Sequence, residues 1–151
     1  MGACNCAPHP LGPEPNRAPD LKWSAPALLE YMDRALAEAD HLFEAHPGLS
    51  GRKEVLFSLR LLITELYSNA VRHAYGGQPI GPLSLKIWLD ERSAVIQVED
   101  QGVGFRWPTA LRSCECLEEG GYGLALVSQY ANRLEFQSSP KGTVVRCYKS
   151  W

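Results

Sequence analysis

Three polar residues at every fourth position, Glu65, Asn69 and His73, have the types and spacing that suit chemistry. On an α-helix this spacing places them one above the other along a single face. A carboxylate can take a proton from a hydroxyl or a water, and an amide oxygen can complete the oxygen shell of Mg²⁺. The stripe therefore suits a phosphate ligand, and the competing interpretation is a solvated helix face with no ligand.

A long helix, expected from about residue 52 to 74, must carry this stripe, because apolar residues recur there at steps of three and four. The apolar residues of its buried face are Val55, Leu56, Leu59, Leu62, Ile63, Leu66 and Ala70. A preceding helix is expected to have Ser24 as its N-cap and Pro26 in its first turn, and to end before Pro47.

Alternation of apolar and polar residues predicts strands over 83–89 and 94–98, joined as a hairpin, and over 134–136 and 143–148, joined by a turn at 139–142. A short edge strand is expected at 21–23. The apolar face of such a sheet needs the long helices as its cover. The predicted fold class is therefore an α/β two-layer sandwich, with a mixed, largely antiparallel sheet covered by about three helices.

Two glycine-containing segments extend the candidate site. One strand is expected to run into Asp100, followed by Gly102 and Gly104, which places a carboxylate at a sheet end beside backbone that a ligand can approach closely. The other segment opens a third helix, whose free N-terminal amides suit a phosphate. Its residues are Gly121, Tyr122, Gly123 and Leu124.

Length, charge and composition argue against several classes of protein. A length of 151 residues suits one domain, and a net charge of −2 argues against an electrostatic nucleic-acid binder. No apolar run approaches the ~18 residues of a membrane span, and the N-terminus lacks a secretory signal pattern. Five cysteines, an odd number without a sign of export, favour reduced thiols in the cytoplasm.

Residues 1–20 are rich in proline and poor in apolar side chains. This composition predicts a disordered tail outside the fold. The expected organisation is therefore a tail over 1–20 followed by one domain over 21–151.

In order and spacing, the three candidate segments resemble the N, G1 and G2 boxes of the GHKL-type, or histidine kinase-like, ATPases. Within that superfamily the chain is most similar to the bacterial anti-sigma factor serine-protein kinase family. The resemblance covers about residues 21–148 and includes Gly142-Thr143 on the last strand. It implies a Bergerat-type ATP-binding fold with ATP and Mg²⁺ as cofactors.

The resemblance also implies a role for each matching residue. Asp100 would accept a hydrogen bond from the adenine amino group, with Thr143 assisting through a water. Asn69 would hold Mg²⁺, and Glu65 would be the catalytic base that activates a serine hydroxyl. Nucleotide contacts are further implied for the glycine boxes and for His73, whose competing role is to cap or pack the helix end. The box residues are Gly102, Gly104, Gly121, Tyr122, Gly123 and Leu124.

The implied function is a Mg-ATP-dependent serine-protein kinase that binds a sigma factor and phosphorylates a small antagonist protein on serine. The family leaves a homodimer open, and it implies neither nucleic-acid nor membrane binding. Three alternatives remain. The first is an ATP-binding interaction module without phosphate transfer, and the second is a detached histidine-kinase catalytic domain. The third is a nucleotide-gated metal or redox sensor, built on Cys4, Cys6, Cys114 and Cys116.

Overall fold

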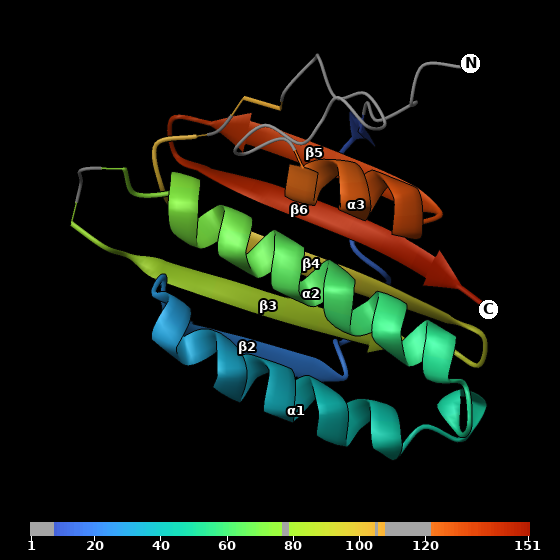
Figure 1. Ribbon diagram of the computed structural model, residues 1–151. Helices are drawn as coiled ribbons and strands as arrows, with labels where there is room; N and C mark the ends of the chain where they lie inside the picture. Colours follow the sequence, from blue (N-terminus) through green and yellow to red (C-terminus); the bar gives the residue numbers. More distant parts are fainter. Residues whose placement is uncertain (1–7, 77–78, 105, 108–121) are drawn as a thin grey trace.

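The structure, a computed structural model, describes residues 8–76, 79–104, 106–107 and 122–151. In these residues six strands form one sheet, and three α-helices lie on one of its faces (Figure 1). The strand order is β1-β5-β6-β4-β3-β2. The strands are β1 His9–Pro10, β2 Leu21–Pro26, β3 Pro82–Leu89, β4 Ser93–Asp100, β5 Arg133–Ser139 and β6 Gly142–Ser150. The predicted two-layer fold class is confirmed.

Both predicted hairpins are present, since β3 pairs with β4 and β5 pairs with β6, each antiparallel. The expected edge strand is longer than predicted and corrects the start of the first helix. Ser24 and Pro26 lie in β2 opposite Ser84 and Pro82 of β3, so neither belongs to a helix. An edge position tolerates the missing N–H of Pro26, because the outer side of an edge strand has no neighbouring strand to bond.

The helices bury their apolar faces against the sheet. They are α1 Met32–Glu44, α2 Lys53–His73 and α3 Tyr122–Tyr130, with short 3₁₀ turns at Leu29–Tyr31 and Pro47–Leu49. The core lies between α2 and the inner side chains of the sheet, such as Leu62 and Ile63 against Leu85 and Ile96. Among the helices of the described residues, none combines the length and apolarity needed to cross a bilayer.

The prediction that residues 1–20 form a disordered tail is wrong for residues 8–20, which we call the N-terminal segment. His9 and Pro10 pair parallel with β5, and the following residues run along the sheet face that is turned away from the helices. Trp88 of β3 donates its indole N–H to the carbonyl of Arg17 at 3.0 Å. Residues 1–7 lie outside the described part of the chain.

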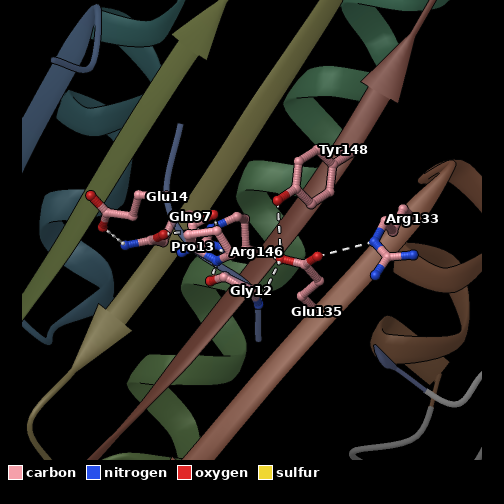
Figure 2. A network of polar contacts seen from close by, with 8 residues as sticks. All are labelled: Gly12, Pro13, Glu14, Gln97, Arg133, Glu135, Arg146 and Tyr148. Carbon is pink, nitrogen blue, oxygen red and sulfur yellow. Dashed lines mark hydrogen bonds and ion pairs between the residues drawn. The ribbon is translucent and has the colours of Figure 1, made fainter. Parts of the chain in front are cut away.

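Arg146 of β6 is the main anchor of the N-terminal segment and is only 2% exposed (Figure 2). Its Nη1 donates to the carbonyls of Gly12 at 2.8 Å and Pro13 at 3.1 Å, and it pairs with Glu135 at 3.0 Å. Its Nε donates to Gln97 at 2.8 Å. A buried guanidinium needs acceptors for its N–H groups, and the backbone of the N-terminal segment supplies two of them. The composition of the N-terminal segment does not reveal these contacts, because its backbone carbonyls make them and its side chains do not.

Glu135 of β5 is the anionic member of this network. It accepts hydrogen bonds from Arg133 Nε at 3.0 Å, the Tyr148 hydroxyl at 3.0 Å and the Gly12 amide at 3.4 Å. Burial raises the pKa of the Glu135 carboxyl, but its hydrogen bonds to these three residues and to Arg146 outweigh burial and lower that pKa overall. The carboxylate therefore stabilises the folded state.

A close contact joins the loop after β4 to the end of α2. The amide of Val103 donates to the carbonyl of Ala74 at 2.9 Å, and a Cβ added at Gly102 would overlap that carbonyl. The Tyr75 hydroxyl donates to the carbonyl of Pro82 at 2.5 Å and accepts from the Gln101 amide at 3.0 Å. These contacts set the position of the β4 end relative to the last turn of α2.

We predict that Glu135→Gln lowers the free energy of unfolding by about 1.5–3 kcal/mol at neutral pH, because charge-assisted hydrogen bonds become neutral ones. The pKa of Glu135 is lowered in the fold from the ordinary value of 4.5. Its contribution is therefore present above that value and is lost as pH falls through the folded pKa. Urea unfolding of parent and variant across this pH range measures both effects.

Glu44→Gln is the matched control, because Glu44 is an exposed carboxyl at the end of α1. It is expected to shift stability by less than about 0.5 kcal/mol. Equal losses for the two variants, or a stability gap between parent and Glu135→Gln that does not narrow in acid, would contradict the role of the Glu135 network.

We predict that Gly102→Ala destabilises the fold by about 1–3 kcal/mol, because the added methyl group must displace the Ala74 carbonyl or the loop. Gly76→Ala is the control, since a Cβ at Gly76 has no heavy atom of another residue within 4 Å. Thermal unfolding measures both variants. A Gly102→Ala variant as stable as Gly76→Ala would show that the close contact is unimportant.

Candidate functional site

The C-terminal half of α2 carries the predicted polar stripe of Glu65, Asn69 and His73. The helix forms here because its opposite face buries a run of apolar side chains against the sheet. Glu65 and His73 are half-buried, whereas Asn69 is 8% exposed. Neighbouring elements enclose this turn of α2, so the position of Asn69 does not fit the competing interpretation of a solvated helix face.

The Asn69 carboxamide is well suited to a ligand. In the part of the chain that is described, its side chain takes part in no hydrogen bond. The carboxamide atoms keep a small solvent-accessible area, through which a ligand can reach them. Its oxygen is of the kind that Mg²⁺ accepts in a mixed shell with phosphate oxygens. The residue present fits the metal that the motif implies.

Burial shifts the pKa values of two residues of the stripe in opposite directions. Burial raises the pKa of the Glu65 carboxyl, and the positive charge of Arg72 opposes this rise. A raised pKa makes the carboxylate a better proton acceptor. Burial lowers the pKa of His73, and the charge of Arg72 lowers it further. This shift favours the neutral imidazole, which has one ring nitrogen to donate a hydrogen bond and one to accept.

Asp100 is the last residue of β4 and is 6% exposed. Its Oδ1 accepts a hydrogen bond from the Gly102 amide at 2.9 Å. Burial raises the pKa of Asp100, whereas hydrogen bonds from the backbone of Gly102 and Thr143 lower it and the nearby charge of Glu99 raises it. A buried carboxylate at the end of a strand is an acceptor held in a fixed position. It suits a ligand that presents an N–H donor.

Thr143 and the glycines complete this end of the sheet. Thr143 of β6 pairs directly with Asp100, and its hydroxyl lies 2.8 Å from that of Ser138. Gly104 has a φ of +96°, and a Cβ there would come within 2.7 Å of the Ser139 carbonyl. The loop after Asp100 therefore requires glycine both for its backbone conformation and for its close packing.

The third predicted segment is only partly described. Tyr122, Gly123 and Leu124 form the first turn of α3, as expected, whereas Gly121 lies outside the described residues. Leu124 is buried in the core, so its contact with a ligand is limited to backbone atoms. Most of the expected loop over 106–120 also lies outside the description, including two of the four cysteines of the sensor alternative. The other two fall in residues 1–7, so the structure does not test that alternative.

The fold brings the stripe and Asp100 to one end of the molecule. His73 immediately precedes Ala74, whose carbonyl is bonded to the loop that follows Asp100. Sequence reasoning assigned no role to Tyr75, which ties this loop to the start of β3, or to Ser138, which bonds Thr143. The sequence signal for Tyr75 was its place at the end of the segment that resembles the N box, directly after the helix. Ser138 had none.

Comparison with known proteins gives the family of the chain. Residues 25–149 match the family described as Histidine kinase-like ATPase domain. The chain is 27% identical over 103 residues to an anti-sigma F factor from Bacillus cytotoxicus, an alignment that covers 64% of this chain and 70% of the relative. It is 30% identical over 95 residues to the serine-protein kinase RsbW from Bacillus velezensis, covering 57% of this chain and 59% of the relative.

A solved structure shares the fold. The histidine kinase domain of an Erythrobacter litoralis blue-light activated histidine kinase superposes with a TM-score of 0.53 at 20% identity. The superposition covers 80% of this chain and 59% of that one. The family match extends from residue 25, near the end of β2, to residue 149 in β6, and includes every described element of the site. The resemblance predicted from the three motifs is confirmed, and the chain belongs to the histidine kinase-like ATPase domain family.

Proposed function

We propose that the protein is a Mg-ATP-dependent serine-protein kinase that acts as an anti-sigma factor or a similar partner-switching regulator. The observation that carries the proposal is that a buried Asp100 and the Glu65–Asn69 stripe lie at the same end of the fold. The printed names of the relatives, an anti-sigma F factor and a serine-protein kinase, support it. Its protein partners would then be a sigma factor and a small antagonist with an acceptor serine, in the cytoplasm.

Recognition of the base would rest on Asp100. Its carboxylate would accept a hydrogen bond from the adenine amino group, which guanine lacks at the equivalent position. Thr143, opposite Asp100 in the sheet, is placed to assist from β6. The hydrogen bond from the Gly102 amide holds the carboxylate in a single orientation before the nucleotide arrives. A fixed acceptor makes the preference for adenine stronger than a mobile one would.

Holding the phosphates would fall to Asn69 and to the first turn of α3. Mg²⁺, when bound with ATP, neutralises phosphate charge and so favours transfer. Asn69 would supply an oxygen ligand to that metal, and the free backbone amides that begin α3 would donate to phosphate oxygens. His73, whose pKa is lowered by burial, would donate or accept one hydrogen bond at the same end of the helix.

Glu65 would take the proton from the serine hydroxyl of the partner. It lies one helical turn before Asn69, on the same face of α2. The raised pKa of its carboxyl suits a proton acceptor. The second candidate is an ATP-binding module without phosphate transfer. The observation in its favour is that the charge of Arg72 acts on Glu65 and lowers its pKa against the rise caused by burial, so Glu65 could serve to balance that charge and not as a base.

We predict that Asp100→Asn weakens ATP binding by about 1–3 kcal/mol, or roughly 5- to 150-fold, because an amide N–H can face the adenine amino group. Glu99→Gln is the control, since it removes a neighbouring carboxylate that points to the opposite face of β4. Isothermal titration calorimetry with Mg-ATP and Mg-GTP measures the effect. Equal affinity of the parent for both nucleotides would overturn the adenine assignment.

We predict that Glu65→Gln keeps ATP binding but lowers phosphate transfer by about 10²–10⁴-fold, because the amide retains size and loses the base. Glu38→Gln, an exposed change on α1, is expected to transfer at the parent rate. The measurement is single-turnover transfer from labelled ATP to the serine of a small antagonist protein, at saturating nucleotide.

Two outcomes separate the candidate functions. A Glu65→Gln variant that transfers at the parent rate would place the base elsewhere. A parent protein that binds Mg-ATP and yet phosphorylates no antagonist would favour the binding module over the kinase.

A further inference from the structure

A groove of about 450 Å³ lies at the opposite end of α2 from the candidate ATP site. The first turns of α2, the end of α3 and the end of β6 form it, and these three ends lie together in Figure 1. Its lining residues are Lys53, Glu54, Phe57, Ser58, Tyr130 and Lys149. We call this feature the docking groove.

An aromatic pair, Phe57 and Tyr130, lines the docking groove. Phe57 is 60% exposed, although it lies on a helix whose other large apolar side chains are mostly buried. Its ring meets that of Tyr130 edge to face, with centroids 6.3 Å apart. An exposed aromatic side chain beside a hollow offers apolar area that a bound side chain can remove from water.

The rim of the docking groove is positive. Lys53 and Lys149 form no ion pair within the described residues, and Glu54 is the one acidic side chain among those that line the groove. A second hollow of about 310 Å³ adjoins the groove along the first turn of α2 and adds Arg52. A ligand that complements this surface carries carboxylates next to an apolar side chain.

We propose that the docking groove binds an acidic segment of a protein partner. An aromatic or aliphatic side chain of that segment packs on Phe57 and Tyr130, and its carboxylates lie against Lys53 and Lys149. The assignment of this partner as the regulator's substrate or target rests on the proposed kinase function; the binding itself does not. Phe57 and Asn69 are twelve residues apart on α2, or about 18 Å along its axis. A partner held at the docking groove therefore leaves the ATP end of α2 accessible.

The test measures binding of a synthetic acidic peptide, in which glutamates flank a phenylalanine and a leucine, to the full chain without nucleotide. Fluorescence anisotropy of the labelled peptide is the readout. Phe57→Ser is expected to weaken binding by roughly tenfold or more, and Lys53→Glu by roughly tenfold. The same peptide with lysines in place of glutamates, or serines in place of the apolar residues, is expected to bind more weakly to the parent.

Matched variants control for general surface effects. Leu29→Ser removes an apolar side chain that is 55% exposed elsewhere, and Lys22→Glu reverses an exposed charge on β2. Both are expected to bind the acidic peptide as the parent does. Circular dichroism of each variant verifies that its fold is retained, and Phe57→Ala replaces any serine variant that is not folded.

Three results would overturn the proposal. The first is unchanged affinity in folded Phe57→Ser or Phe57→Ala, and the second is equal binding of the acidic and basic peptides. The third is self-association of the parent that Phe57→Ser abolishes, without peptide binding, because the occupant would then be a second copy of the chain. Calorimetry with Mg-ATP on the same samples keeps the two proposals distinct. A parent chain that binds Mg-ATP but not the acidic peptide overturns the docking groove alone. A parent chain that binds the peptide but not Mg-ATP overturns the proposed nucleotide function alone.

Discussion

The close approach between the end of α2 and the loop after β4 is the constraint on which the candidate site depends. Gly102 has no side chain, so the loop lies directly against the Ala74 carbonyl, and the Val103 amide bonds to it. The loop in this contact directly follows Asp100, and the helix in this contact carries the Glu65–Asn69 stripe. The proposed acceptor for the base, Asp100, and the proposed metal ligand, Asn69, come from distant parts of the sequence, and this contact brings them to one end of the fold.

The two faces of the sheet differ in the side chains that they carry. The inner face is apolar and packs against the helices, whereas the outer face carries a polar row that runs from Lys86 through Gln97 and Arg146 to Glu135, each directly paired with the next. A buried guanidinium on an uncovered face would lack acceptors. The N-terminal segment covers it and supplies backbone carbonyls (Figure 2). The N-terminal segment thus covers the outer face of the sheet, and the candidate site lies on the side of the helices.

Periodicity predicted most of the fold, because α2 and the two hairpins are defined by local patterns of apolar residues. It failed where the deciding contacts were distant or polar. Arg146 lies more than a hundred residues from the carbonyls that it binds, so nothing in residues 8–20 indicated order. Ser24 and Pro26 have the types of a helix start, but pairing with β3 outweighs that local preference. The burial of Asn69 likewise depends on tertiary packing and not on its own helix.

The site residues are a separate case, since their identities were predicted by motif order and spacing while their roles remain proposals. The most direct measurement is a crystal structure of the full chain with Mg²⁺ and a non-hydrolysable ATP analogue. The account predicts the adenine amino group within hydrogen-bond distance of the Asp100 carboxylate and the metal bound by the Asn69 side-chain oxygen. A nucleotide bound elsewhere on the chain, or one whose metal has no contact with Asn69, would contradict the account.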